Sequence, residues 1–232
     1  MKTKLDNRLL TVASCVEKGA YLADIGTDHA YLPIYLAEND MLSGAVASDI
    51  HKGPIESARK NIADAGLSDL IHTELTDGLH GIEKYPVTDI AIAGMGGMMI
   101  AGILEAAPFI RERKTRLILQ PMQHIPELRR ELAEKGYRIE KEVQTMAEGK
   151  FYQILCAVYD GKTREICDLE AYLGAYNIAH KTENKENFTL LCKRHLDILN
   201  EKIKGMEKGG HDATAERRLA EEITRELREI ET

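Results

Sequence analysis

Between Tyr21 and Asp160, short apolar runs alternate with amphipathic stretches, which is the pattern of strands joined by helices. The apolar runs predict strands at Tyr21–Ile25, Ala45–Ser48, Leu70–Leu75, Asp89–Ala93 and Arg116–Leu119. The segments between them predict helices at Tyr31–Glu38, Pro54–Ala65, Gly97–Ala107 and Ile125–Glu134. Pro54 suits a first helical turn, and Gly66 and Gly136 suit helix ends. The alternation predicts a doubly wound, mostly parallel α/β sheet.

The end of this region departs from the alternation. The stretch "GYRIEKEVQTMAEGKFYQILCAVYD" predicts two strands joined by a tight turn around Glu148–Lys150, and the strands of such a hairpin are antiparallel. Five parallel strands closed by an antiparallel hairpin make the Rossmann-like seven-stranded sheet of class I methyltransferases, with its last strand antiparallel. Dinucleotide dehydrogenases normally keep the sheet parallel, so the hairpin favours the methyltransferase layout.

After Asp160 the strand pattern stops, and two amphipathic helices are predicted. The first runs from about Asn184 to Lys208 and is marked by Phe188, Leu191, Leu199 and Ile203, with Leu196 and Ile198 beside them. Beyond Gly209–Gly210, a second apolar stripe consists of Ala215, Leu219, Ile223, Leu227 and Ile230. We expect an antiparallel α-helical hairpin, a short coiled coil, and hence two domains at residues 1–160 and 161–232. The hairpin is either a packing appendage or an arm that grips the substrate.

Composition narrows the class of protein. With 232 residues and 44% hydrophobic residues, the chain can build a sizeable core. No apolar run approaches the roughly 20 residues that span a bilayer, and the N-terminus resembles an amphipathic helix more than a secretory signal, so we expect a cytoplasmic protein. None of the four cysteines forms a CxxC or CxxH pair and no HExxH occurs, so we expect buried thiols and no metal site.

The charge balance is acidic. The formal net charge is −7, with 18 basic and 23 acidic residues up to Asp160 and 13 and 15 after it. Neither half is basic, so composition alone leans against a nucleic-acid partner. Local basic clusters occur at Arg111–Arg116 and Arg129–Arg130. We interpret them as a solvated loop and an exposed helix face, and they remain candidate phosphate-binding groups.

Acidic residues stand where the predicted strands end, which is where ligands bind in open α/β sheets. Asp24 and Asp28 flank the turn "DIGTD" after the first strand. Asp49 follows the second strand, 23 residues past Gly26, where a ribose diol needs an acceptor. Asp77 in "TDGL" follows the third strand and could meet an adenine amino group, with Leu79 packed on the ring. A simpler role exists for Asp28, which could cap the helix that starts near Ala30.

The first turn favours a cationic ligand. Asp28 occupies the position of the second glycine of a dinucleotide fingerprint that begins at Gly26. A carboxylate there would repel a pyrophosphate by more than about 1 kcal/mol, whereas it attracts the sulfonium and ammonium groups of S-adenosylmethionine. The later "AGMGG" is either a rival phosphate cradle or a place of tight packing. It lacks the Asn/Asp-Pro-Pro that polarises exocyclic amines in methyltransferases, so it suits an acceptor with its own lone pair, such as a ring nitrogen.

Five motifs, "LADIGTDHAYLPI", "ASDI", "DGL", "IAGMGG" and "ILQPM", resemble in order and spacing the bacterial tRNA (adenine-22-N1) methyltransferase family. The resemblance covers nearly the whole chain, including the helical arm. One position departs from it, since Met122 stands where Asn often follows Gln-Pro in the family.

The resemblance implies transfer of a methyl group from S-adenosyl-L-methionine to N1 of adenine 22 in tRNA. We expect a monomer that needs no metal and no membrane. The residues implied to bind the cofactor are Asp24, Gly26, Thr27, Asp28, His29, Asp49, Ile50, Asp77, Gly78, Leu79, Ala93, Gly94 and Met95. The last three would lie between cofactor and base. The candidates for catalysis are Asp28, His29, Tyr31 and Gln120.

Three other functions remain open. The acidic charge is compatible with a methyltransferase acting on a small molecule or on another RNA. An NAD-dependent oxidoreductase is disfavoured by Asp28 and by the terminal hairpin. A non-catalytic RNA-binding protein that keeps the same fold is the third alternative.

Overall fold

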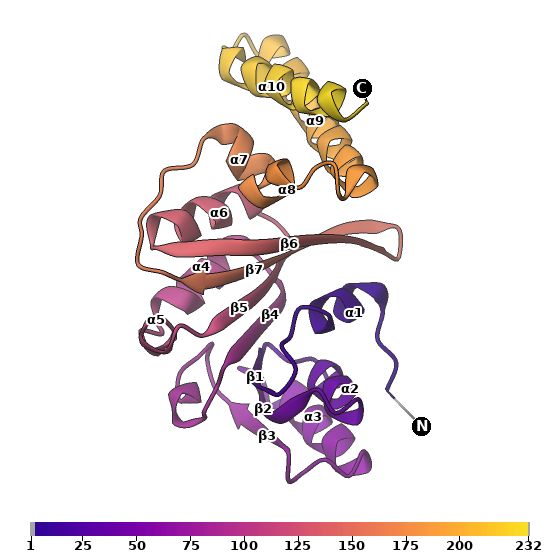
Figure 1. The fold of residues 1–232 in the computed structure, drawn as a ribbon, viewed down its shortest axis with the longest axis vertical. Coiled ribbons are helices and arrows are strands. Elements are labelled where there is room, and N and C mark those ends of the chain that lie inside the picture. The colour runs from indigo at the N-terminus through magenta and orange to yellow at the C-terminus, as the bar shows by residue number, and fades with distance from the viewer. Residues whose placement is uncertain (1–2, 232) are drawn as a thin grey trace. The chain divides into compact units, whose positions relative to one another are not determined.

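In the computed structural model, which describes residues 3–231, one sheet has the strand order β3-β2-β1-β4-β5-β7-β6 (Figure 1). The strands are β1 Ala20–Ile25, β2 Leu42–Asp49, β3 Ile71–Leu75, β4 Asp89–Met95, β5 Arg116–Pro121, β6 Tyr137–Ala147 and β7 Lys150–Tyr159. Strands β1 to β5 pair in parallel, and β7 is antiparallel to both β5 and β6. The predicted seven-stranded layout with an antiparallel last strand is confirmed.

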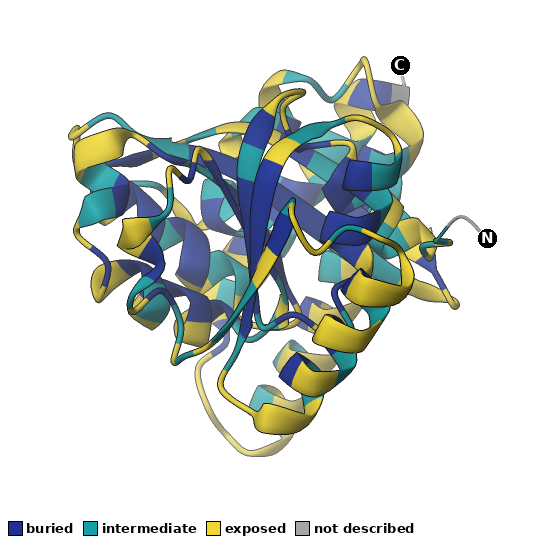
Figure 2. Ribbon diagram, turned by 90° about the horizontal axis from the view of Figure 1, so that it is seen from below, coloured by how far each residue is buried: buried dark blue, intermediate teal, exposed yellow. Residues whose placement is uncertain are grey.

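Helices cover both faces of this sheet. They are α1 Asn7–Ala13, α2 Tyr31–Glu38, α3 Lys52–Asp64, α4 Gly97–Glu105, α5 Phe109–Arg113 and α6 Ile125–Glu134, with a short 3-10 turn η1 at Ile82–Lys84. Apolar residues of α1, α2 and α3 share one core with Ile118 of β5, whereas those of α4, α5 and α6 share a second core with its neighbours Leu117 and Leu119. Successive residues of a strand thus point into opposite cores, and the strands, which lie between the two cores, are buried (Figure 2).

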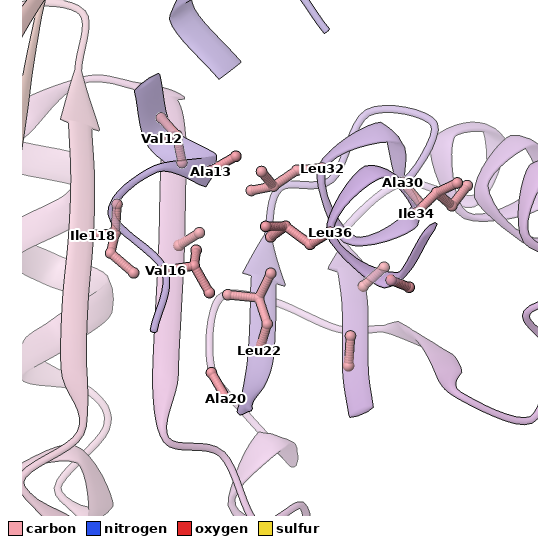
Figure 3. Packing of buried hydrophobic residues seen from close by; sticks show 14 of the residues in the cluster. Val12, Ala13, Val16, Ala20, Leu22, Ala30, Leu32, Ile34, Leu36 and Ile118 are labelled. Carbon is pink, nitrogen blue, oxygen red and sulfur yellow. The ribbon is translucent and has the colours of Figure 1, made fainter. Parts of the chain in front are cut away.

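Helix α1 is anchored to this sheet by its C-terminal end. Val12, Ala13 and the following Val16 belong to the core that contains Leu32 and Leu36 of α2 (Figure 3). The helix begins at Asp6, whose carboxylate accepts the backbone N–H of Leu9 at 2.7 Å.

The interpretation of the two basic clusters as a solvated loop and an exposed helix face was wrong in part, since residues 112–114 are exposed but only 114–115 lie outside helix and strand. Residues 111–113 form part of α5, and Arg116 opens β5, where it pairs with Glu17. On α6, Arg129 is only 1% exposed, and its Nη2 and Nε donate to the two carboxylate oxygens of Glu142 at 2.6 and 3.1 Å. Gln153 Oε1 accepts a further bond at 2.9 Å. A buried guanidinium needs such partners. Here they lie on β6 and β7, so the sequence of α6 alone does not indicate them.

The chain divides into two compact units, Met1–Arg164 and Glu165–Thr232. The second contains α7 Asp168–Leu173, α8 Ala175–Ala179, α9 Lys185–Lys208 and α10 Thr214–Glu231. The predicted pair of long helices is confirmed, and apolar residues of both are buried, namely Phe188, Leu191, Leu199, Leu219, Ile223 and Ile230. One position of the predicted stripe was wrong, because Ala215 is exposed and Ala213 is buried instead. No helix within residues 3–231 combines the length and apolar character that crossing a bilayer requires.

Replacing Arg129 by Ala is expected to lower the free energy of unfolding by about 3–5 kcal/mol, because the buried carboxylate of Glu142 would lose the guanidinium that neutralises its charge. Urea denaturation measures the change. The matched control is the neighbouring, half-buried Arg130, whose replacement by Ala should cost much less. Equal losses in the two variants would contradict a special role for the buried pair.

Candidate functional site

The carboxyl ends of β1 to β5 meet at one edge of the sheet, because these strands run in parallel. Asp24, near the end of β1, is 7% exposed and accepts a hydrogen bond from Thr27 Oγ1 at 2.6 Å. Burial raises the pKa of Asp24 to about 6, although the bond from Thr27 and the positive charge of Arg8 oppose the rise. Asp24 is therefore a buried acid that a nearby cation would ionise fully.

The turn after β1 is strained where it begins α2. His29 and Ala30 have φ of 64° and 57°, in the left-handed region that favours glycine. Ala30 is the N-cap of α2, and no side chain caps that helix. The alternative role of Asp28 as a helix cap is therefore wrong. Consecutive left-handed residues of this kind persist where surrounding structure holds them, and they are frequent at ligand sites.

Three candidate side chains of this turn face solvent. The side chain of Asp28 is 81% exposed, and its Oδ1 lies 3.1 Å from His29 Nε2. The ring of His29 stacks on Tyr31 with centroids 5.3 Å apart and an interplanar angle of 28°. Tyr31 is itself 43% exposed. A carboxylate and two stacked rings are therefore accessible to a ligand beside buried Asp24.

The ends of β2 and β3 supply the next predicted residues. One carboxylate oxygen of Asp49 accepts the backbone N–H of His51 at 2.7 Å and lies 3.1 Å from its Nδ1. The adjacent Ile50 is exposed, although large and apolar. Asp77 is exposed as well, and together with Gly78 it lines a cavity of about 480 Å³. The cavity is also lined by Leu79, His80, Met99, Gly102, Ile103 and Ala106.

Strand β4 carries a bulge at Gly94. In the pairing with β5, Ala93 opposes Gln120 and Met95 opposes Pro121, so Gly94 has no partner residue. Its φ is 84°, and its N–H donates to the side-chain Oε1 of Gln120 at 3.1 Å. The strand predicted to end at Ala93 therefore continues irregularly to Met95, and Gly94 lies exposed at the site.

Gln120 is not available to stack on a ligand, because its side chain is completely buried within β5. Its Nε2 donates to Pro121 O at 3.0 Å and lies 3.5 Å from Met122 Sδ. Gln120 instead fixes the bulge. The exposed side chain that follows it is Met122, at the position that departs from the family pattern.

Arg8 of α1 also reaches this edge, and sequence reasoning missed it. Its Nη1 donates to Gln120 Oε1 at 3.0 Å, on the same oxygen that accepts from Gly94. The only signal in the sequence was a lone arginine on the polar face of an N-terminal amphipathic helix. Nothing in that pattern says which edge of the sheet the helix approaches.

The turn after β1 touches the bulge of β4. A Cβ added at Gly26, whose φ is 71°, would collide with Met95 Cε. Glycine at this position therefore lets the two segments approach closely. This contact joins the acid-bearing turn to the exposed backbone of Gly94.

The site suits a ligand that carries a cation and a diol. Asp24, Asp28, Asp49 and Asp77 contribute four carboxylates around the ends of three strands. Such a set disfavours a pyrophosphate and favours an ammonium or sulfonium group with a ribose. Among the described residues, no group of three or more His, Cys, Asp or Glu side chains could hold a metal ion. S-adenosylmethionine has the groups that this arrangement of acids fits.

Comparison with known proteins agrees with this chemistry. A family model described as "Methyltransferase domain" matches residues 5–155. The chain is 44% identical to the "tRNA (adenine(22)-N(1))-methyltransferase" of Bacillus subtilis over 165 residues, which cover 68% of this chain and 69% of that protein.

Solved structures give the same family. The B. subtilis M1A22 tRNA methyltransferase TrmK has a TM-score of 0.77 and 32% identity, over 99% of this chain and 98% of that one. Sp1610 of Streptococcus pneumoniae, a candidate tRNA (m1A22) methyltransferase in complex with S-adenosyl-L-methionine, has a TM-score of 0.83 and 32% identity. That match covers 97% of this chain and 100% of the other.

Replacing Asp28 by Ala is expected to change the free energy of unfolding by no more than about 0.5 kcal/mol, because the exposed carboxylate does not cap α2. Urea denaturation of the variant and the parent protein checks this. A loss of about 1 kcal/mol or more, the usual cost of removing a cap, would show that Asp28 stabilises the fold.

Proposed function

The chain belongs to the tRNA (adenine(22)-N(1))-methyltransferase family, and from that premise we propose that it methylates N1 of adenine 22 in tRNA with S-adenosyl-L-methionine. The observation that carries the proposal is the contact between Gly26 and Met95. It joins an acid-lined turn, suited to a cationic donor, to a bulged strand end with exposed backbone, suited to an acceptor base.

The acidic edge is the proposed cofactor site. Asp24, with Gly26, Thr27 and Asp28 of the turn, would hold the amino-acid part of the cofactor. The free carboxylate oxygen of Asp49 would bind the ribose diol, because the other oxygen is engaged by His51. The adenine would lie against Ile50 and the cavity lined by Asp77, Gly78 and Leu79. When bound, S-adenosyl-L-methionine supplies a methyl group that is already activated by its sulfonium.

The protein's own task is then to position the acceptor. N1 of adenine has an in-plane lone pair, so no base has to remove a proton before it attacks. The tRNA nucleotide must leave its stack, and its N1 must be aligned with the methyl group. His29 and Tyr31 are accessible rings on which the base can stack. The backbone carbonyls of Ala93 and Gly94, or the carboxylate of Asp28, would accept hydrogen bonds from N6 and stabilise the cationic product.

We assign the methyl transfer to residues 1–160 and the gripping of tRNA to the helical arm, residues 161–232. Within the arm, Arg225 and Arg228 line a cavity of about 450 Å³ together with Leu196, Asn200 and the acidic Glu221. Cations beside an apolar side chain offer contacts to both phosphates and bases. We further propose that the protein works as a monomer in the cytoplasm, where its tRNA substrate is present.

A small-molecule methyltransferase is the second candidate, and the net charge of −7 favours it. An acidic protein gains no general attraction to a polyanion. Incubating the protein with S-adenosyl-L-methionine and either tRNA or free adenosine separates the two candidates.

Mass spectrometry of nucleosides from the incubated tRNA is expected to show 1-methyladenosine, and primer extension should place it at position 22.

Replacing Asp28 by Ala is expected to lower the rate of methyl transfer at least about tenfold, since a carboxylate of the site is lost. Near-normal turnover of the variant would remove Asp28 from the site. Methylation of adenosine with none of tRNA would support the second candidate.

The affinity for S-adenosyl-L-methionine is expected to rise with pH through about 6, where buried Asp24 ionises in the ligand-free protein. Because a bound cation favours the ionised carboxyl, the dissociation constant should be about tenfold larger near pH 5 than near pH 7. Isothermal titration calorimetry measures it at both pH values. Replacing Asp24 by Asn should weaken binding and flatten this dependence, whereas an unchanged pH dependence in that variant would assign it to another group.

A further inference from the structure

The guanidinium group of Arg8, on α1, contacts the side chain of Gln120 near the end of β5. The side chain of Arg8 is 22% exposed, so most of it lies against the protein. Nη1 donates to Gln120 Oε1 at 3.0 Å, and the guanidinium carbon lies 5.9 Å from the centre of the Tyr152 ring on β7. Nε lies 3.8 Å from Asp6 Oδ2, at the start of the same helix. The guanidinium is therefore oriented from several sides.

Gln120 Oε1 is shared between Arg8 and the bulge. It accepts from Arg8 Nη1 and from Gly94 N, while the Nε2 end of the same amide donates to Pro121 O. A donor with a formal charge polarises and orients the carbonyl that it contacts. Without Arg8, that oxygen would keep the Gly94 N–H as a donor, and the amide would keep its bond to Pro121 O, but the oxygen would lose its charged donor.

We propose that Arg8 is a positioning residue for methyl transfer, which acts through Gln120 to fix the bulge at Gly94. This inference rests on the proposed function only where methyl transfer to tRNA is measured. The bulge presents the backbone that faces the acceptor base, and a displacement of about 1 Å in a positioning group can cost on the order of a hundredfold in rate. Helix α1 thus acts on the proposed acceptor site through Arg8, although it is not one of the segments that follow the strand ends.

Two other roles for Arg8 fit the geometry less well. A phosphate ligand would need a cation free of acids, but Arg8 lies beside Asp6 and acts electrostatically on Asp24. A role through Asp24 would concern the cofactor. The positive charge of Arg8 is the weakest of the three influences on the pKa of that acid, after burial and the bond from Thr27.

Arg8→Ala is expected to lower kcat about tenfold, with the KM for tRNA and the dissociation constant for S-adenosyl-L-methionine nearly unchanged. Arg8→Lys should recover most of kcat, because an ammonium group can donate the same bond to Gln120. In a Gln120→Ala background, Arg8→Ala should lower kcat no further, since the two residues act as one unit. In glycine-labelled protein, the amide resonance of Gly94 should shift in both single variants.

The matched control is Asn7→Ala, which removes a bond from the adjacent side chain of α1 to Met146 O on β6. This variant should keep kcat and the Gly94 resonance, and an equal loss of kcat there would reduce Arg8 to a packing role. A raised KM for tRNA with unchanged kcat would make Arg8 a phosphate ligand and overturn the proposal. Weaker cofactor binding in Arg8→Ala would overturn it as well.

The Gly94 resonance requires no methyl transfer, so it tests Arg8 independently of the proposed function. If the Gly94 resonance shifts in a protein that methylates no tRNA, the proposed function is rejected, and the positioning of Gly94 by Arg8 is kept. If the resonance does not shift in an active protein, the positioning role of Arg8 is rejected, and the proposed function is kept.

Discussion

At Gly94, strand β4 holds one residue more than β5 opposes, and the extra N–H must find an acceptor outside the ladder. The side chain of Gln120 supplies it from inside β5. Met95, the next residue of this strand end, contacts Gly26 in the turn after β1. One completely buried side-chain amide therefore satisfies the bulge at the strand end that contacts the acidic turn.

The acidic charge of the molecule favours the cationic cofactor and disfavours the polyanionic tRNA. Four carboxylates near the ends of β1, β2 and β3 suit a cationic donor, but they repel the phosphates of an RNA. With a net charge of −7, the protein has no long-range attraction for tRNA. Under the proposed function, affinity for tRNA would come from local cations and from stacking, which are the roles proposed for Arg225 and Arg228 of the arm and for the rings of His29 and Tyr31.

The sheet and the strand-end acids could be predicted because they follow local patterns. The bounds Tyr31–Glu38 and Ile125–Glu134 agree with α2 and α6, and Asp24 lies near the end of β1, just before the turn that its motif indicates. The burial of Arg129 and Gln120 could not be predicted, because their partners come from other strands or helices. Residue type suggested exposure for both, and tertiary hydrogen bonds reversed it. The contribution of α1 was hidden for the same reason, since no local pattern records which edge a helix meets.

The strained turn explains how an exposed Asp28 can still be well placed. Left-handed geometry at His29 and Ala30 costs about 1–3 kcal/mol for each residue. Two features hold it. Asn61 Nδ2 donates to His29 O at 3.0 Å, and the methyl group of Ala30 is fully buried in the core of α1 and α2, where Figure 3 shows it beside Ile34. Because folding already meets this cost, the backbone on either side of Asp28 is ordered before any ligand arrives, and binding has only the side chain left to immobilise.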